Sequence, residues 1–441
     1  MIKVAKFGGS SLANAAQFRK VAQIIQADAD RKYVVPSAPG KRFAGDTKVT
    51  DMLYAAYALA QNGEEFTEAL QAIRARYQEI INELQLDMSF EKEFATITDR
   101  FAAKAGKDYA ASRGEYLNGL IMAKFLQIPF IDAADVIRFN EAGEYDDAAT
   151  MALLAPKLLE PAFERAVIPG FYGAMETCDG LVVKTFSRGG SDITGSIVAK
   201  AAMADVYENW TDVSGFLLTD NRIVKDAAPI DYITYRELRE LSYMGATVLH
   251  DEAIFPVQQV DIPIHIKNTN APQDPGTQIV GRTVHKTPHT ITGIAGKRGF
   301  CSITIEKDRM NSEIGFGRKV LQAFEDHEIS FEHMPSGIDT MTVFVDQEHF
   351  IPKEQNVISD IRHLVNPDEI EIEADLALIA VVGRGMKSAH GTAAKIFGAL
   401  SDAKVNVKMI DQGSSELNVI IGVRDADFET AIRAIYQAFV A

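Results

Sequence analysis

Residues 3–11 read Lys-Val-Ala-Lys-Phe-Gly-Gly-Ser-Ser, a short apolar run that ends at two adjacent glycines. An amphipathic stretch follows as far as Ile25, and a second apolar run, residues 33–38, ends at Pro39-Gly40. Strand, glycine break and helix in alternation are typical of an α/β domain with a largely parallel sheet. The opening of the chain therefore predicts such a domain.

The alternation is interrupted once and then resumes. Residues from about 63 to 110 are rich in Glu, Ala, Leu, Gln and Arg and contain no proline, which favours a helical insert. Strand-like runs follow at residues 128–132, 166–169, 180–185, 204–210 and 262–267. Residues 270–276 have the composition of a loop. We therefore expect the first domain to occupy residues 1–283.

Beyond residue 290 the sequence repeats itself at a constant offset (391 − 315 = 76), without a gap. The offset matches strand, glycine and helix positions in order: Ile303 with Ile379, Gly315 with Gly391, and Phe324 with Leu400. Each copy reads strand, helix, strand, strand, helix, which suggests a ferredoxin-like unit. Two such copies, at about 291–350 and 371–441, can cover each other's sheets or helices.

Composition limits the possible partners. The chain has 441 residues, enough for two to four domains at ~100–200 residues each. Lys and Arg total 45 against 61 Asp and Glu, a net charge of −16. A chain this acidic repels a phosphate backbone, which argues against a broad nucleic-acid surface. An anionic substrate must be captured locally, by a few basic side chains, backbone amides or a metal ion.

The cysteines and apolar runs indicate the compartment. Cys178 and Cys301 are far apart and match no metal spacing, which excludes a disulfide framework and fits a reducing environment. The first residues lack the apolar core of a signal peptide, and no apolar run reaches the ~18 residues that span a bilayer. We expect a cytoplasmic protein without membrane or nucleic-acid partners.

Two glycine-rich turns carry the first candidate chemistry. Gly8 and Gly9 let backbone amides approach an anion, and Lys6 adds a mobile positive charge. In the second turn, residues 187–192, Arg188 precedes two glycines and offers a fork for a carboxylate or phosphate. The ordinary alternative is a harmless strand end and two capped helices. No GxxxxGK[ST], HRD or DFG segment is present, which excludes a P-loop enzyme and a protein kinase.

A third polar segment begins after the strand-like run 204–210. Thr211 and Asp212 follow it directly, and polar groups after a strand lie at the ligand-binding edge of an open α/β sheet. By itself such a Thr-Asp pair would indicate only a turn.

Taken together, these segments resemble the aspartate kinase (aspartokinase) family over nearly the whole chain. The matching pieces are KFGGSS (6–11), SRGE (112–115), FSRGGSD (186–192), WTDVSG (210–215), TDNRIV (219–224), GATVLH (245–250) and PGTQI (275–279). The resemblance implies a monofunctional enzyme in which an amino acid kinase fold, three layers around a mainly parallel sheet, covers residues 1–283. Two ferredoxin-like ACT domains would follow within 290–441. The chain departs from the family at Asn221, often proline, and at Thr247, often lysine.

The resemblance also assigns roles to individual residues. The catalytic residues would be Lys6, which neutralises the phosphoryl group, and Asp192, which orients that lysine or the substrate amine. The aspartate site would comprise Ser37, Thr50, Glu115, Arg188 and Ser191, with Arg188 on the α-carboxylate and Glu115 on the α-ammonium. The ATP site would comprise Lys6, Phe7, Gly8, Gly9, Thr211, Asp212, Leu217, Arg222, Thr247 and Val248. Mg²⁺ is expected from the chemistry, without any assigned ligand.

In lysine-sensitive relatives, the first ACT unit holds the effector. The positions implied here are Met310, Ser330, Phe331, Glu332 and Ser336, with Glu332 paired to an ammonium group. Alternatively, Glu332 is a solvated strand residue. Lys408 stands opposite Glu332 in the second copy (408 − 332 = 76), so the two copies are not equivalent at this position.

The implied reaction transfers the γ-phosphoryl group of ATP to the β-carboxylate of L-aspartate, giving 4-phospho-L-aspartate. This would be the first step of lysine, threonine and methionine biosynthesis, inhibited by lysine, in a homodimer joined through the ACT domains or a tetramer. Two other classes stay open at this point. One is another amino acid kinase, acting on acetylglutamate, glutamate or a nucleotide monophosphate. The other is an amino-acid sensor with an inactive kinase domain.

Overall fold

The computed structural model describes residues 1–178, 180–187, 189–246, 249, 253–282 and 289–440. The chain forms two compact units. Unit 1 comprises Met1–Phe216, Asp231–Tyr235 and Val248–Thr283. Unit 2 comprises Leu217–Ile230, Arg236–Thr247 and Val284–Ala441. Short segments within the predicted first domain thus belong to the second unit.

Unit 1 is built on a seven-stranded sheet of order β4-β2-β1-β7-β9-β10-β8. The strands are β1 (Lys3–Phe7), β2 (Arg31–Pro36), β4 (Ala166–Val167), β7 (Val206–Thr211), β8 (Tyr232–Thr234), β9 (Ile264–Asn268) and β10 (Thr277–Val280). All neighbouring pairs are parallel except β9 and β10. The central strand β1 lies between β2 and β7, and its Lys6 is in register with Val35 and Asn209. The carboxyl ends of these three strands therefore meet at one edge of the sheet.

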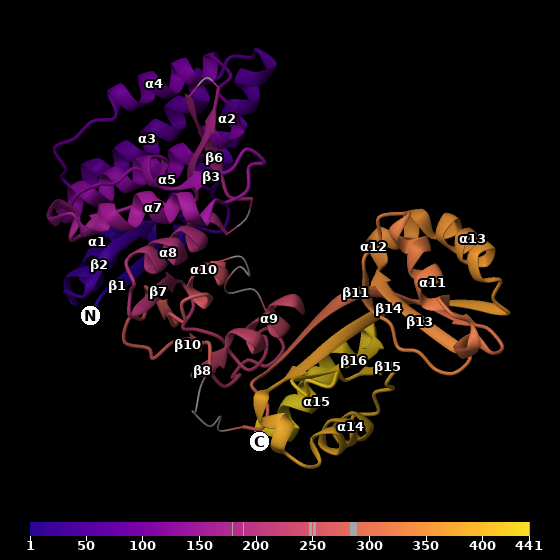
Figure 1. The fold of residues 1–441 in the computed structure, drawn as a ribbon. Coiled ribbons are helices and arrows are strands. Elements are labelled where there is room, and N and C mark those ends of the chain that lie inside the picture. The colour runs from indigo at the N-terminus through magenta and orange to yellow at the C-terminus, as the bar shows by residue number, and fades with distance from the viewer. Residues whose placement is uncertain (179, 188, 247–248, 250–252, 283–288, 441) are drawn as a thin grey trace. The chain divides into compact units, whose positions relative to one another are not determined.

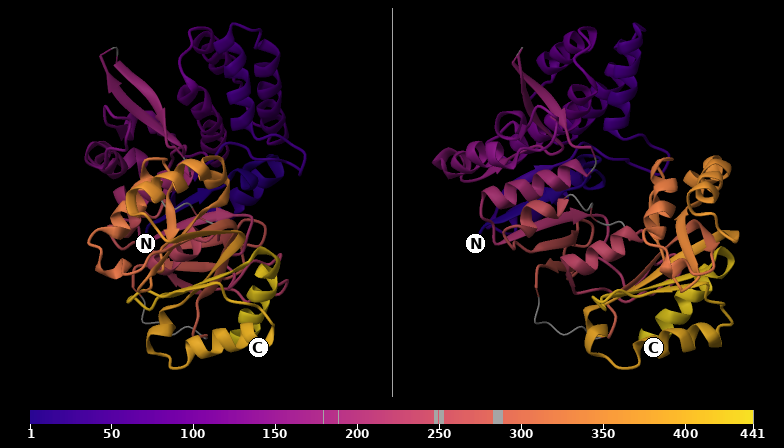
Figure 2. Two further views of the ribbon diagram at one scale, coloured as in Figure 1. Left: turned by 90° about the vertical axis from the view of Figure 1, so that its right-hand side faces the viewer. Right: turned by 45° about the vertical axis from the view of Figure 1, so that its right-hand side comes forward.

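Helices cover this sheet and extend beyond it. They are α1 (Ala15–Gln26), α2 (Val49–Asn62), α3 (Thr67–Glu83), α4 (Glu91–Ala102), α5 (Lys107–Leu126), α6 (Ala133–Val136), α7 (Asp147–Leu159), α8 (Gly190–Ala201) and α10 (Phe255–Gln258). A small sheet pairs β3 (Arg138–Phe139), β5 (Tyr172–Thr177) and β6 (Gly180–Thr185). Strands β5 and β6 form an antiparallel hairpin. Figure 2 shows this hairpin and helices α2–α4 on the same side of the large sheet.

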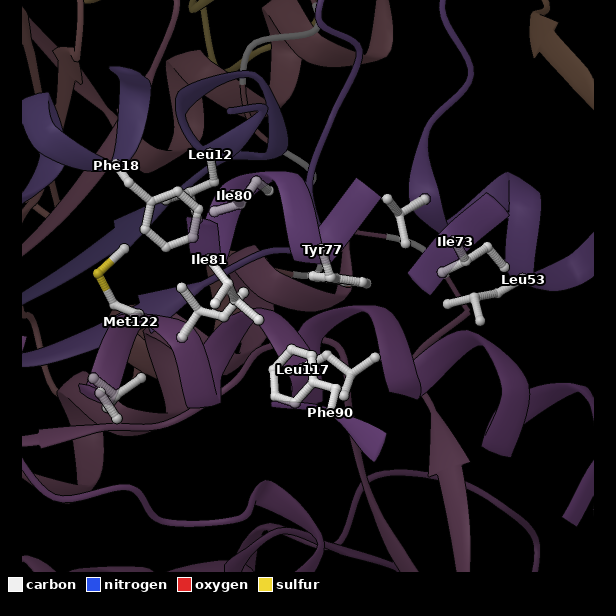
Figure 3. Close-up of a cluster of buried hydrophobic side chains, with 14 of the residues drawn as sticks. Leu12, Phe18, Leu53, Ile73, Tyr77, Ile80, Ile81, Phe90, Leu117 and Met122 are labelled. Atoms are coloured by element: carbon white, nitrogen blue, oxygen red, sulfur yellow. The ribbon is translucent and has the colours of Figure 1, made fainter. Parts of the chain in front are cut away.

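The core of unit 1 joins the sheet to the helical insert. Phe18 on α1, Tyr77 on α3 and Leu117 on α5 are fully buried in one cluster, which Figure 3 shows in close-up. The Tyr77 hydroxyl donates to the Gly114 carbonyl at 2.7 Å, so the insert is tied to the α5 segment that precedes Glu115. The insert thus supports the helix that carries a predicted substrate residue.

Unit 2 is a six-stranded sheet of order β12-β13-β11-β14-β16-β15. The strands are β11 (Gly293–Glu306), β12 (Phe331–His333), β13 (Thr340–Asp346), β14 (Glu369–Val382), β15 (Met409–Asp411) and β16 (Asn418–Arg424). The helices are α9 (Tyr235–Tyr243), α11 (Phe316–Glu325), α12 (Gln347–Phe350), α13 (Glu354–Val365), α14 (Thr392–Asp402) and α15 (Phe428–Val440). The starts of α11 and α14 reproduce the offset of the sequence repeat (392 − 316 = 76).

The two repeats share their longest strands, which the sequence pattern did not reveal. Strands β11 and β14 run side by side along 14 residues each (Figure 1). Residues 300–306 of β11 pair with β13, whereas residues 376–382 of β14 pair with β16. The first half of β11 therefore completes the second repeat, and the first half of β14 completes the first. The ladder shifts register around Gly299, whose φ of +86° suits a glycine bulge.

The predicted fold class is confirmed: a three-layer α/β domain on a mainly parallel sheet is followed by two ferredoxin-like units. Among the described residues, no helix has the length and apolar character needed to cross a membrane.

Candidate active site

Lys6 lies near the carboxyl end of β1, with only 6% of its surface exposed. Its ammonium forms an ion pair with Asp192, in the first turn of α8. Asn209 on β7 donates from Nδ2 to Asp192 Oδ1 at 2.8 Å, and the Tyr207 hydroxyl donates to the Asp192 backbone carbonyl at 3.0 Å. A buried ion pair is favourable only when its geometry and remaining hydrogen bonds are satisfied. The two strands and the helix therefore fix one positive charge at the sheet edge.

Gly9 follows β1 and passes very close to a second turn. The Gly40 amide donates to the Gly9 carbonyl at 2.8 Å, and a Cβ on Gly9 would lie 2.9 Å from the Ala38 carbonyl oxygen. Only glycine allows this approach. Gly9 also opens a short 3-10 turn, η1 (Gly9–Leu12), whose first amides have no acceptor within the turn. These amides are suited to an anion beside Lys6.

The role predicted for the Gly8 amide needs correction. The Gly8 amide donates to the Trp210 carbonyl at 3.0 Å, because β1 and β7 extend their pairing by one residue, so it does not point to a phosphoryl group. Phe7 is fully buried, with its ring stacked on Trp210 at a centroid distance of 5.9 Å. The Phe7 side chain is thus part of the core, and the contact of Phe7 with ATP stays a prediction.

Ser37 and Ser191 come together although they are 154 residues apart in the sequence. The Ser37 hydroxyl, just after β2, donates to the Ser191 hydroxyl at 2.7 Å, and Asn118 Nδ2 donates to the Ser37 carbonyl at 2.6 Å. Thr50 lies in the first turn of α2, where its Oγ1 would be 3.8 Å from a Cβ on Gly114. The side chains predicted to surround the substrate thus come from β2, α2, α5 and α8.

Glu115 is buried on α5 and only half satisfied. Its Oε1 accepts from the Ala38 amide at 3.0 Å, whereas Oε2 has no hydrogen-bond partner among the described residues. Burial raises the pKa of the carboxyl to about 8, against the opposing effect of the Ala38 amide. A buried carboxyl with one free oxygen suits a ligand that brings a positive charge.

The raised pKa predicts a pH-dependent stability. In the folded protein the pKa of Glu115 is about 8, against an ordinary value of 4.5, so the carboxyl stays largely protonated until the pH approaches 8. Its stabilising contribution is therefore complete below pH 4.5 and is lost as the pH rises through about 8. We expect Glu115→Gln to raise the melting temperature of the ligand-free protein by an increment that grows across this window. Thermal unfolding at several pH values, with the exposed Glu83→Gln as control, tests this; an increment independent of pH contradicts it.

The predicted nucleotide residues are divided between the units. Thr211 ends β7 in unit 1, and its hydroxyl donates to Asp212 Oδ1 at 3.2 Å. Leu217 belongs to unit 2, where it bridges to Pro229. Arg222, also in unit 2, is exposed and forms an ion pair with Asp220 at 2.5 Å. Arg188, Thr247 and Val248 lie outside the described residues, so their roles remain predictions.

The predicted effector residues all belong to unit 2, and two of them, Phe331 and Glu332, are on β12. Met310 is buried, Ser330, Phe331 and Ser336 are exposed, and Glu332 is intermediate. Glu332 Oε2 accepts from the Tyr243 hydroxyl at 2.5 Å. Tyr243 ends α9, so the alternative of a freely solvated Glu332 does not describe this structure. Lys408, its counterpart in the second repeat, pairs with Glu373 at 2.6 Å instead.

Helix α9 is attached to both repeats. Its Glu237 is completely buried, accepts from the Thr292 hydroxyl at 2.6 Å and pairs with Arg384 at 2.6 Å. Its Glu240 accepts from Asn418 at 2.6 Å. With the Tyr243–Glu332 bond, α9 contacts the second repeat near its start and the first repeat at its end. A ligand at Glu332 would therefore act on this helix directly.

Sequence reasoning missed several residues of the site. Asn209, which holds Asp192, reads as an ordinary position of a buried strand. Asn118 lies three residues after Glu115, hence on the same face of α5, and its Oδ1 is buried without a partner among the described residues. In the sequence, the available signal for Asn118 was an amide side chain three residues after Glu115 on the same predicted helix. The Glu237 network had none, because its partners Thr292 and Arg384 are distant in the sequence.

Comparison with known proteins gives concordant results. Residues 1–268 match the amino acid kinase family and residues 379–439 match an ACT domain. The chain is 42% identical to aspartokinase 3 of Bacillus subtilis, covering 100% of this chain and 99% of that protein. It is 52% identical to the crystal structure of aspartate kinase from Clostridium acetobutylicum, with a TM-score of 0.91 over 99% of both chains.

A more distant relative has been solved with ligands. Aspartokinase III of Escherichia coli is 28% identical and was crystallised with aspartate and ADP in an R-state, with a TM-score of 0.75 over 99% of both chains. It was also crystallised with lysine and aspartate in a T-state, with a TM-score of 0.76 over 100% of both chains. These structural matches cover nearly the full length of both chains, so they include the kinase domain and the two repeats.

Proposed function

Since the chain belongs to the amino acid kinase family and, within it, to the aspartate kinases, we propose that it phosphorylates the β-carboxylate of L-aspartate with the γ-phosphoryl group of ATP. The product is 4-phospho-L-aspartate. The observation that carries this proposal is Lys6, a buried ammonium beside a glycine turn, held by Asp192 at the carboxyl end of a parallel sheet. Open α/β sheets bind their ligands at this edge.

The chemistry requires screening of charge rather than a general base. An aspartate side chain has a pKa near ~3.9, so the nucleophile is already ionised at neutral pH. The obstacle is repulsion between a carboxylate and a triphosphate. Lys6 and the first amides of η1 offset that repulsion and stabilise the charge on the transferring group. Asp192 and Asn209 keep Lys6 in position before substrate arrives, so little reorganisation is needed during the reaction.

Magnesium enters as part of the nucleotide substrate. Among the described residues, no group of three or more His, Cys, Asp or Glu side chains is arranged to hold a metal ion. Mg²⁺ commonly binds through substrate phosphates with one or two carboxylates and several waters, so a cage made only of protein is not required. We therefore take Mg²⁺–ATP as the substrate form and assign no protein ligand to the ion.

Glu115 and Arg188 distinguish aspartate from other dicarboxylates in this proposal. The free Oε2 of Glu115 takes the α-ammonium, and that charge lowers the pKa of the buried carboxyl again. Arg188 takes the α-carboxylate. Glu115→Gln should therefore weaken discrimination against succinate, which lacks the ammonium. Comparing kcat/KM for aspartate and succinate in both forms tests this assignment, and an unchanged ratio contradicts it.

We also propose that the enzyme opens the lysine, threonine and methionine branch of biosynthesis and that lysine inhibits it through the first repeat. Support comes from the lysine-sensitive aspartokinase 3 of Escherichia coli, 29% identical over 99% of this chain and 98% of that protein. The carboxylate of Glu332, in a segment with the exposed Ser330 and Ser336, suits an ammonium group. Because Glu332 already accepts from Tyr243, a bound ammonium competes with the end of α9.

We expect a homodimer joined through unit 2. Strands β12 and β15 are the outer strands of the six-stranded sheet. Each carries an exposed large apolar side chain, Phe331 on β12 at 46% and Ile410 on β15 at 51%. Exposed apolar side chains of this size on outer strands favour association with another chain. Light scattering at micromolar concentration should give twice the mass of one chain, with tetramers as a further possible state.

A matched pair of variants makes the assembly prediction specific. Phe331→Asp places a charge on the outer strand β12 and should shift the protein toward monomer. Leu159→Asp changes an exposed apolar residue of unit 1 and should leave the mass unchanged. A monomer in the unmodified protein, with and without amino acids, would contradict the proposed interface.

A further inference from the structure

A polar cavity lies in unit 1, between α4 and α5. Its volume is about 170 Å³, and it is lined from α4 by Lys92, Glu93, Thr96 and Ile97 and from α5 by Tyr109, Arg113 and Tyr116. Positions 113 and 115 lie two residues apart on a helix of ~3.6 residues per turn, so they project to nearly opposite sides. The cavity is therefore separate from the site at Glu115.

Arg113 is a buried cation that has no acidic partner among the described residues. Only 8% of its surface is exposed, and its guanidinium lies over the rings of Tyr116 at 4.3 Å and Tyr109 at 4.8 Å. Nε and Nη2 both donate to the Ser112 hydroxyl, at 3.1 and 3.0 Å. Among the described residues Nη1 has no acceptor, and Nη2 has a second hydrogen. Because buried arginines are normally paired with an acid, the Nη1–Nη2 edge is suited to an anion from outside.

Glu93 supplies the opposite charge in the same cavity. Its Oε2 is shielded from solvent and has no hydrogen-bond partner among the described residues. An unsatisfied buried carboxylate oxygen is costly, and it is suited to a donor that enters with a ligand. Within the described part of the chain, the cavity thus presents one carboxylate and two cations, the buried Arg113 and the exposed Lys92, and none of the three forms an ion pair.

We propose that this cavity binds a free amino acid with a small side chain. Arg113 receives the carboxylate in a forked contact, Glu93 receives the ammonium, and the tyrosine rings face the aliphatic part. A volume of about 170 Å³ has room for a small zwitterion. The site does not depend on the proposed phosphoryl transfer or on the effector site in unit 2.

The test measures binding of glycine, L-alanine and L-serine to the full-length protein by saturation-transfer NMR. Acetate, which lacks the ammonium, and ethylammonium, which lacks the carboxylate, are the partial ligands. Arg113→Lys keeps the charge but loses the fork, and Glu93→Gln keeps the shape but loses the charge. Glu332→Ala and Glu115→Gln control for binding at the other two sites, and circular dichroism checks that each variant is folded.

We expect at least one of the three amino acids to bind saturably. Arg113→Lys and Glu93→Gln should each weaken that binding by about 10- to 100-fold, as loss of a charge-assisted contact does, whereas the two control variants should not. Acetate binding should fall in Arg113→Lys and not in Glu93→Gln. Absence of saturable binding at millimolar concentration, or equal binding in wild type and Glu93→Gln, overturns the proposal. Glu93 is only partly buried, so its variant serves even if the Arg113 variant fails to fold.

Discussion

Replacing Lys6 by alanine should lower kcat by about 10²–10³-fold, the usual effect of removing one preorganised electrostatic group from a transition state. The Lys6 ammonium is buried, already oriented by Asp192, and lies at the sheet edge beside the first amides of η1. The KM for aspartate should change far less, because the proposal assigns the two ends of that substrate to Glu115 and Arg188. Steady-state kinetics with both substrates varied measures the two effects separately.

Lys3 provides the matched control. It lies on the same strand and pairs with Asp28 at 2.7 Å, at the opposite end of β1 from the glycine turn. Lys3→Ala should leave kcat near the wild-type value. Since Lys6→Ala leaves Asp192 without its cation, circular dichroism must show that the variant is folded. An effect of Lys6→Ala confined to KM would refute the role assigned to this lysine.

The second large effect is expected on regulation. Glu332→Ala should raise the lysine concentration for half-inhibition by about 10- to 100-fold, because a charge-assisted hydrogen bond contributes about 1.5–3 kcal/mol. Activity without lysine should stay close to wild type, since the substitution leaves Lys6, Asp192 and Glu115 untouched. Inhibition requires that lysine bind an inactive arrangement more tightly than the active one. By reciprocity, aspartate with a non-hydrolysable nucleotide should weaken lysine binding by the same factor by which lysine weakens the binding of those ligands.

Tyr243→Phe separates binding from its consequence. The change removes the hydroxyl that occupies Glu332 but keeps the charge that attracts lysine. Lysine should bind this variant at least as tightly as wild type, whereas Glu332→Ala should bind it weakly. Direct binding measurements on both variants compare them. If saturating lysine leaves wild-type activity unchanged while threonine inhibits, the effector assignment is wrong even though the reaction is unaffected.

The fold was largely predictable because its signals are local or periodic. Residues 3–11 specify a strand and a glycine turn, and the constant offset between the two copies (391 − 315 = 76) identifies the repeat without any structure. Strand sharing between the repeats was not predictable, because the two halves of β11 and of β14 pair with different neighbours that are distant in the sequence. No local pattern in either strand identifies those neighbours. The assignment of α9 to unit 2 depended likewise on distant contacts such as Glu237–Arg384.

The site was predictable in its residue types rather than in its hydrogen bonds. Lys6, Asp192 and Glu115 stand in recognisable motifs, and the structure brings Lys6 to Asp192 as expected. The Gly8 amide donates to the Trp210 carbonyl because the pairing of β1 with β7 continues one residue beyond β1, and the sequence does not reveal this. Asn209 escaped notice because its role depends on strand register alone.

The most direct test of the account is aspartate-dependent release of ADP from Mg²⁺–ATP, with hydroxylamine present to trap an acyl phosphate. The account predicts ADP release with L-aspartate, accompanied by an equal amount of aspartyl hydroxamate, and little release with succinate or acetylglutamate. No release above background with L-aspartate, or a preference for acetylglutamate, would contradict it.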